Sequence, residues 1–289
     1  MVNPMLKDRY ELASVTLLII ATVFFILKRT ILFDISETVL TLVEVIIFFG
    51  FTVVHGKKTI GIWNTLIFLV ITYSLTLMLE YIGALGLIPG CKWHYTTNLG
   101  PMFMDKVPYI IPLTWFTYIY CVYSMTNVIF GKISEDRSEF ERIGSVKKFI
   151  KLYLVSMVAG AIMMSWDLIN DPVMVARGNW YWPEGGLYYG IPLMNYFGWF
   201  STSALIYLIF SIYMSLVKRG QIYFKTIENK RSVATIYVIV PYLLALIFQG
   251  IDSFIYGVQY ALPWAGVTMS IAIVITIWRF IKIRNKQIE

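Results

Sequence analysis

Charged residues are scarce in this sequence of 289 residues, where they make up 14% of the positions while hydrophobic residues make up 58%. Soluble domains carry about 25% charged residues, so the composition excludes an ordinary soluble domain. The apolar residues gather in long runs, and a helix needs about 20 residues to cross the hydrocarbon core of a bilayer. The sequence therefore predicts a protein that crosses the membrane several times.

Cysteine and histidine are also rare. Cys91 falls in a predicted loop and Cys121 lies deep in a predicted helix, so we expect no disulfide between them, and the absence of a CxxC pair argues against iron–sulfur chemistry. The two histidines, His55 and His94, are predicted on opposite sides of the membrane, which argues against a histidine metal site or a Ser-His-Asp triad. The glycines in "EGGLYYG" do not form a phosphate-binding loop. We therefore expect neither a metal site nor a bound nucleotide.

The apolar runs predict an all-α bundle of about eight membrane spans in a single domain, residues 1–289, with seven spans as the alternative. The expected spans are 12–28, 36–54, 60–82, 107–130, 149–169, 190–216, 233–251 and 260–280. The second and the last are the weakest of these predictions, and helix ends are the least predictable feature of a sequence.

Lysine and arginine predict the orientation. With eight spans, the basic loops 131–148 and 217–232 fall on the same side as both termini, and the positive-inside rule makes that side cytoplasmic. Lys28 and Arg29, in the first predicted outer loop, are the exception. Because the positive charges accompany apolar spans, we interpret the net charge of +7 as an orientation signal. A nucleic-acid partner is not expected, and the protein is predicted to lie in the cell membrane.

Two acids stand out in "SWDLINDP". If the helix continues past Asp167, the i,i+4 spacing places Asp167 and Asp171 on one face. Two neighbouring carboxyls in a poorly solvated site do not both ionise easily, so one is expected to keep its proton beside a carboxylate. That arrangement suits general acid–base catalysis. The alternative is a plain turn at Asn170-Asp171-Pro172, because proline disfavours helix at the residue before it.

Two further acids close predicted spans. Glu80 ends "LTLMLE", and Asp252 follows the seventh apolar run. Ionisable residues inside a membrane segment are functional candidates because burying them is costly. For Glu80, the alternative is a carboxylate that simply reaches the lipid headgroups. We take Glu80 as the third catalytic candidate and Asp252 as a candidate for substrate binding.

Aromatic residues crowd around these acids beyond what an interfacial belt requires. The candidates for lining a substrate or stabilising a cation are Tyr95, Trp115, Trp166, Trp180, Trp182, Tyr188, Tyr189 and Trp199. Ring faces attract cations, and a carbocation formed by protonation of an alkene would be stabilised in such a site. Asn195 is predicted either to orient a water molecule or to form a hydrogen bond between helices.

The stretch "WDLINDP" followed by "GNWYWPEGGLYYGIPLMNYFGWF" resembles the membrane hydratases of carotenoid biosynthesis, of the bisanhydrobacterioruberin or acyclic carotenoid 1,2-hydratase type. Glu80 at the end of a span, "HYTTNLGP" and "VPYIIPLTWF" agree with the same family. The resemblance covers roughly residues 75–200. The segment "PGCKWHYT" departs from the family's pattern, and we expect this departure to concern a wall of the pocket and not the acids.

The resemblance implies addition of water to the terminal C=C of an acyclic carotenoid, giving a tertiary alcohol. Asp167, Asp171 and Glu80 would then be the catalytic residues, a lipophilic carotenoid the substrate, and membrane lipids the surroundings. Hydration changes no oxidation state, so no cofactor is implied. Two alternatives stay open: a cyclase that uses the same protonation, and a lipid or proton-coupled transporter with its acids as ion sites.

Overall fold

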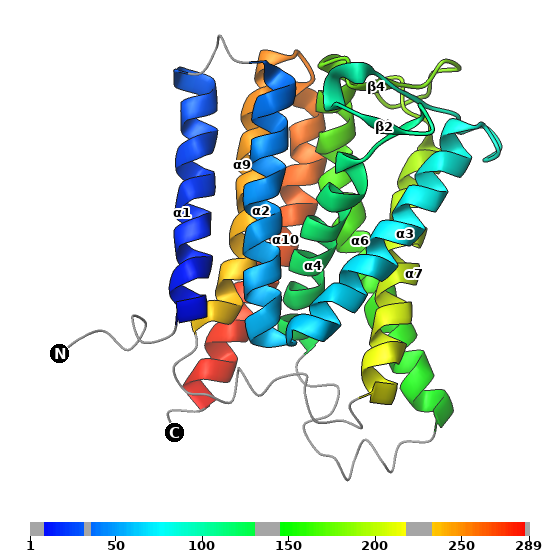
Figure 1. Cartoon of the computed structure of the whole chain (residues 1–289). Coiled ribbons are helices and arrows are strands. Elements are labelled where there is room, and N and C mark those ends of the chain that lie inside the picture. The colour runs from blue at the N-terminus through cyan, green and yellow to red at the C-terminus, as the bar shows by residue number, and fades with distance from the viewer. Residues whose placement is uncertain (1–8, 32–35, 131–144, 218–232, 287–289) are drawn as a thin grey trace.

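Eight long helices dominate the residues that the computed structural model describes, which are 9–31, 36–130, 145–217 and 233–286 (Figure 1). The helices are α1 Arg9–Thr30, α2 Glu37–Thr59, α3 Ile62–Ala84, α4 Ile110–Phe130, α6 Ser145–Ala176, α7 Leu193–Val217, α9 Ile239–Ile255 and α10 Leu262–Lys286. Three short 3₁₀ helices accompany them: η2 Thr97–Leu99, η3 Val233–Val238 and η4 Gln259–Ala261. The prediction of an all-α membrane bundle of about eight helices is confirmed.

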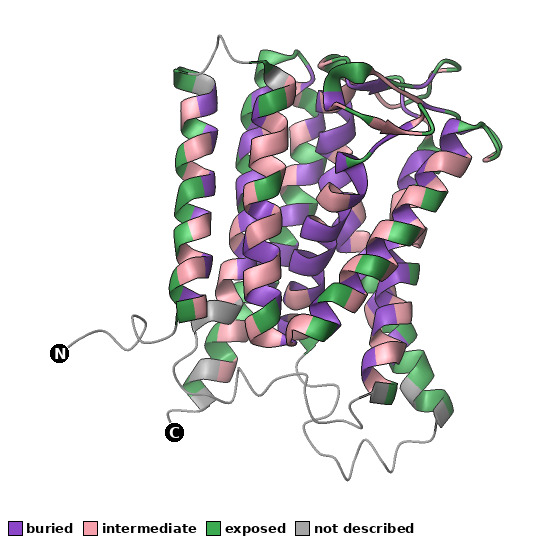
Figure 2. Cartoon of the chain, viewed as in Figure 1, coloured by how far each residue is buried: buried purple, intermediate pink, exposed green. Residues whose placement is uncertain are grey.

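Seven of these helices are long and apolar enough to cross a membrane, and α4 is the exception. The second and last helices, whose prediction was weakest, are both among the seven. Helix α4 packs against α2, α3, α6, α9 and α10 and is largely buried (Figure 2). Ile119 and Tyr120 on it are fully buried. Because its side chains face protein instead of lipid, α4 tolerates the threonines and tyrosines that lower its hydropathy.

One end of the bundle, at the top of Figure 1, is covered by the loops 85–109 and 177–192; we call it the capped end. Two short antiparallel ladders order these loops. They are β1 His94–Tyr95 with β4 Trp180–Tyr181, and β2 Met102–Phe103 with β3 Val107–Pro108. The first ladder places Tyr95 opposite Trp180. It therefore ties the loop that follows α3 to the loop that follows α6, and the predicted acids lie near both loops.

Helix α1 begins and α10 ends at the end of the bundle away from the cap (Figure 1). An even number of crossings places the two ends of a chain on one side, as eight spans require. The basic loops that predict a cytoplasmic location for this side fall largely on residues 131–144 and 218–232, outside the described residues. The orientation accordingly stays a prediction.

Lys28 corrects the predicted end of the first span. Helix α1 continues to Thr30, so Lys28 is a helical residue and not part of an outer loop. Its ammonium lies 3.3 Å from the carboxylate of Glu44 and 3.3 Å from the hydroxyl of Thr41, both on α2, and the residue is buried. Because Lys28 is buried and paired with Glu44, it does not act as an orientation signal, which explains a lysine on the predicted outer side.

Helix α6 corrects a second prediction. We expected the fifth span to end near residue 169, and the alternative placed Asp171 in a turn. Instead α6 continues to Ala176 with Pro172 inside it, so the turn is wrong and Asp171 is helical. Proline is tolerated in membrane helices because neighbouring groups satisfy the backbone carbonyl that it leaves without a partner. Asp167 thus lies nine residues before the end of its helix, deeper than a span ending near 169 implies.

Helices α6 and α7 pack against each other over an extensive contact, and Gly160 on α6 lies where the two backbones approach closely. A methyl group at Gly160 would lie 2.6 Å from the carbonyl oxygen of Phe200 and 3.0 Å from the Cβ of Ala204. Gly160→Ala is therefore expected to push the helices apart and to destabilise the fold by about 1–3 kcal/mol, the usual cost of overpacking. Thermal unfolding in detergent measures this effect. Gly50→Ala, where the nearest atom is 3.9 Å away, is the control, and an equal midpoint for both variants would contradict the prediction.

Candidate active site

A cavity of about 120 Å³ lies near the capped end, between α1, α2, α3, α4, α6, α7, α9 and the two capping loops. An engineered protein cavity of about 150 Å³ holds benzene. The space therefore suits the end of a hydrocarbon chain and not a whole long polyene. Most of the sequence's tryptophans line it: Trp93, Trp115, Trp166, Trp180, Trp182 and Trp199. Charged residues lie among these rings: Lys28, Glu44, Glu80, Asp171, Arg177 and Asp252.

Glu80, in the last turns of α3, accepts three hydrogen bonds. The Tyr95 hydroxyl donates to Oε2 at 2.7 Å, the Trp93 indole N–H to Oε2 at 3.2 Å, and the Trp115 indole N–H to Oε1 at 3.2 Å. Burial raises the pKa of the Tyr95 phenol well above its ordinary value, and the nearby Glu80 raises it further, so Tyr95 remains a donor. Donors aimed at a carboxylate favour its charged form. The three donors therefore offset part of the cost of burying a charged Glu80 and hold its oxygens in one orientation at the cavity.

Trp93 corrects an expectation from the sequence. The segment "PGCKWHYT" was expected to leave the acids unaffected, yet its tryptophan donates directly to Glu80. Gly83, three residues after Glu80, makes room for that ring, because a methyl group at Gly83 would overlap it. Trp93 also lines the cavity, so the segment does form part of a pocket wall, as expected. The sequence does not indicate that the loop after α3 folds back and brings Trp93 against that helix.

Asp167 and Asp171 lie one turn apart on α6, as the i,i+4 spacing predicts. The side-chain amide of Asn195, on α7, donates to Oδ2 of Asp167 at 3.3 Å and also to Oδ2 of Asp171. Asn195 therefore makes the predicted hydrogen bond between helices, and it also lines the cavity. The two carboxyls are held together by one amide, with no cation bound to either in the described part of the chain.

The two aspartates differ in what they face. Asp171 lines the cavity, whereas Asp167, one helical turn earlier on α6, is fully buried and does not line it. Oδ1 of Asp167 is buried and accepts no hydrogen bond from the described residues. An ionised oxygen in that position is costly, so a proton held by the pair relieves both the burial and the mutual repulsion. The geometry thus makes Asp171 the member that can reach a bound molecule.

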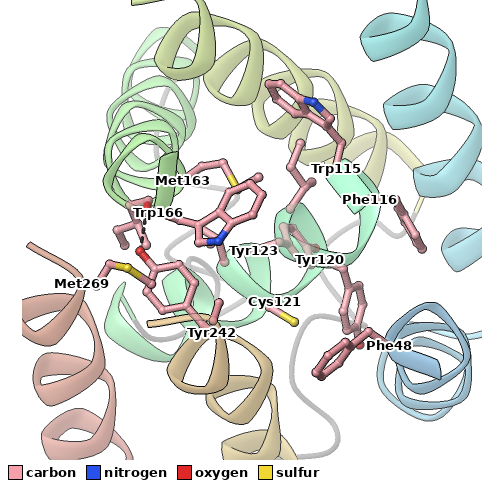
Figure 3. Close-up of a cluster of buried hydrophobic side chains, with 14 of the residues drawn as sticks. Phe48, Trp115, Phe116, Tyr120, Cys121, Tyr123, Met163, Trp166, Tyr242 and Met269 are labelled. Atoms are coloured by element: carbon pink, nitrogen blue, oxygen red, sulfur yellow. Dashed lines mark hydrogen bonds between the residues drawn. The ribbon is translucent and has the colours of Figure 1, made fainter. Parts of the chain in front are cut away.

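Stacked rings form the wall between these acids. The rings of Trp115 and Trp199 stack with centroids 3.7 Å apart, and Trp166 meets Trp199 edge to face at 5.4 Å. Tyr118 stacks on Trp166 at 4.1 Å. Figure 3 shows Trp115 and Trp166 as members of one cluster of buried hydrophobic side chains. Ring faces and carboxyl groups therefore line the same small space.

The remaining predicted residues divide into two groups. Trp180 and Trp182 line the cavity, as does Asp252, whose carboxylate lies 3.7 Å from the guanidinium of Arg177. Tyr188 and Tyr189 are not among the residues that line it. The Tyr188 hydroxyl donates instead to the backbone carbonyl of Leu168 at 3.0 Å. Their prediction as lining residues is therefore not supported by the geometry.

Sequence reasoning missed three charged lining residues, Lys28, Glu44 and Arg177. Glu44 lies inside an apolar run, where an ionisable residue is a functional candidate, so this signal could have identified it. Lys28 directly follows the first apolar run, and only the continuation of α1 to Thr30 makes it a buried helical residue. Arg177 was predicted to lie in a loop, because the expected fifth span ended at residue 169. Once α6 is extended to Ala176, Arg177 follows its last residue directly and its partner on α9 comes within reach.

The cysteines and histidines lie apart, as predicted. Cys91 and Cys121 are free, buried thiols, and burial raises the pKa of Cys91 to about 11. His55 lies on α2 far from the cap, with its Nδ1 2.6 Å from the Tyr120 hydroxyl. His94 belongs to β1 at the capped end. Neither histidine lines the cavity.

Two comparisons with known proteins found a match. A model of the family described as carotenoid biosynthesis protein matches residues 36–275. A bisanhydrobacterioruberin hydratase from Haloarcula japonica is 26% identical over 132 residues, which are 46% of this chain and 40% of that relative. The match therefore spans less than half of the relative's length. No solved structure matches this chain.

Proposed function

Because the chain belongs to the carotenoid biosynthesis protein family, we propose that it is a membrane hydratase that adds water to the terminal C=C of an acyclic carotenoid. The observation that carries the proposal is the placement of Asp171 and Glu80 around one small cavity walled by indole rings. The hydratase relative supports the reaction type. The cavity volume fits the reacting end of the substrate, and the rest of the polyene would extend into the surrounding lipid.

The first step is protonation of the alkene. The Asp167–Asp171 pair holds one proton, and Asp171 presents it to the cavity. The π electrons of the terminal double bond form a new C–H bond with that proton at the less substituted carbon, and the O–H bond of the acid breaks. A tertiary carbocation is left on the neighbouring carbon, and the aspartate pair is left ionised. An acid placed in this way is expected to contribute about 10²–10⁴-fold to the rate.

The cavity wall then stabilises the cation. The open ring faces of Trp115, Trp166 and Trp199 would supply negative electrostatic potential, and Glu80 in its carboxylate form would add negative charge. Because three donors already hold Glu80 in place, it needs no reorganisation when the positive charge develops. Preorganised charge of this kind is the most effective form of electrostatic catalysis.

Water capture completes the reaction. The oxygen of a water molecule bonds to the tertiary carbon, and one of its protons passes to the ionised aspartate pair, which is thereby restored. The net change is the addition of one water, with no oxidation or reduction and therefore no cofactor. Asn195 lines the cavity while it holds both aspartates, so it keeps the acid–base pair beside the site of attack.

The setting that goes with this function is the cell membrane, with both termini cytoplasmic as the basic loops predict. The partners are then the carotenoid and the membrane lipids. The candidate site lies near the capped end, close to the membrane surface, where water is available. The hydrophobic tail of the substrate would pass between helices into the bilayer.

Expression in a host that accumulates an acyclic carotenoid tests the proposal. Mass spectrometry of the extracted pigment is expected to reveal a product heavier by one water, with a tertiary hydroxyl at the chain end, and none in cells with an empty vector. A new product of unchanged mass would identify a cyclase. An unchanged pigment, with the protein present in the membrane, would favour a transporter, and either result would contradict hydration.

A further inference from the structure

Pro172 leaves a gap in the hydrogen bonding of α6 beside the two aspartates. Proline has no backbone N–H, so it cannot donate to the carbonyl four residues earlier, which belongs to Leu168. Leu168 directly follows Asp167, and Pro172 directly follows Asp171. The unpaired carbonyl therefore lies in the one turn of helix that sets the spacing of the two acids. A buried carbonyl without a donor is costly.

The hydroxyl of Tyr188 fills this gap. It donates to the carbonyl oxygen of Leu168 at 3.0 Å, from a loop twenty residues further along the chain. Burial raises the pKa of Tyr188 to about 12, and the residue lies outside the membrane-spanning segments, so the phenol keeps its proton. The Tyr188 hydroxyl can therefore donate this hydrogen bond at neutral pH.

The loop that carries Tyr188 is shaped to aim it. Ile191 donates its backbone N–H to the carbonyl of Tyr188 at 2.9 Å, and the two residues between them, Tyr189 and Gly190, both have positive φ, 53° and 77°. Positive φ at both central positions is typical of a two-residue hairpin turn of type I′, and it is strained for a tyrosine. The Tyr188 ring also packs edge to face on Tyr196 of α7 at 5.6 Å.

We propose that Tyr188 is a positioning residue whose hydroxyl replaces the missing N–H of Pro172 and so holds the helical turn that sets Asp167 and Asp171 against Asn195 and the cavity. The inference rests on the proposed hydration function. It also accounts for the motif "EGGLYYGIP": its residues build a turn that supports α6 and not a ligand-binding loop. Tyr188 acts through the acids and does not contact the substrate.

A double-mutant cycle tests the proposal. Tyr188→Phe removes the hydroxyl, and Pro172→Ala restores a backbone N–H that can donate to Leu168. Tyr188→Phe alone is expected to lower kcat by about 10- to 100-fold, since small misplacements of a catalytic group cost up to about this much, while KM stays within about twofold. The double variant is expected to recover most of the lost kcat. Tyr189→Phe, which removes the neighbouring hydroxyl, is the control and should retain the wild-type kcat.

Hydrogen–deuterium exchange of the peptide covering residues 167–176 provides a readout independent of turnover. Faster exchange is expected in Tyr188→Phe and wild-type protection in the double variant, even if the chain catalyses another reaction or if Pro172→Ala is itself inactive. Unchanged exchange in Tyr188→Phe, or equal loss of protection in the single and double variants, would overturn the positioning role. Rescued exchange without any hydrated product would overturn the proposed function and leave the positioning role standing.

Discussion

Replacing Asp171 with asparagine is expected to lower the rate of hydration by about 10²–10⁴-fold, the usual contribution of a general acid. Asparagine has nearly the same shape and can still pair with Asn195, but it has no acidic proton to give. Asp167→Asn is expected to cost less, because Asp167 is fully buried and does not line the cavity. Initial rates in membranes, normalised to the amount of protein by immunoblot, measure both effects.

The order of the two losses decides which aspartate donates. A larger loss in Asp167→Asn than in Asp171→Asn would indicate that Asp167 donates the proton and would contradict the assignment of Asp171. Full activity in both variants, with normal accumulation of protein, would remove the pair from the mechanism altogether.

Replacing Gly83 with alanine is expected to lower activity by about 100-fold, the cost of a small displacement at a catalytic centre. The added methyl group would overlap the Trp93 ring, and Trp93 must then move away from Glu80, to which it donates. Gly83 has no functional group of its own. The predicted loss of activity would arise because the hydrogen bond from Trp93 to Glu80 is broken. Steady-state kinetics in detergent or in lipid vesicles measure it.

Gly198→Ala is the matched control. Gly198 also lies in a membrane helix, α7, but a methyl group there meets no other atom within 4 Å. It should therefore leave the rate unchanged. If Gly83→Ala were as active as Gly198→Ala, the hydrogen bond between Trp93 and Glu80 would not contribute to catalysis.

The fold followed closely from the sequence because membrane helices obey local rules. Runs of about 20 apolar residues predicted all eight helices, including α4, which is not among the seven long and apolar enough to cross a membrane. The ends were harder to predict. Pro172 indicated a helix end, whereas α6 continues to Ala176. Whether a proline ends a helix depends on a donor from elsewhere in the fold, here Tyr188, and no local pattern contains that information.

The site followed from the sequence only in part. Spacing along one helix placed Asp167 and Asp171 together, since both belong to the same element. Which of them faces the cavity depends on how α6 is rotated against α7, and this is set by tertiary packing. Glu80 was identified as an acid at the end of a span, but its donors come from a loop and from α4. Density of aromatic residues alone did not separate Trp199, which lines the cavity, from Tyr188, which supports a helix.

The central claim is that carboxyl groups in the ring-lined cavity protonate a carotenoid end and that water captures the cation. Turnover of an acyclic carotenoid in D₂O enriched in ¹⁸O, followed by mass spectrometry and NMR of the pigment, tests it most directly. The account predicts one ¹⁸O on the tertiary carbon and one carbon-bound deuterium on its neighbour. A product without ¹⁸O, or one with ¹⁸O but no carbon-bound deuterium, would contradict it.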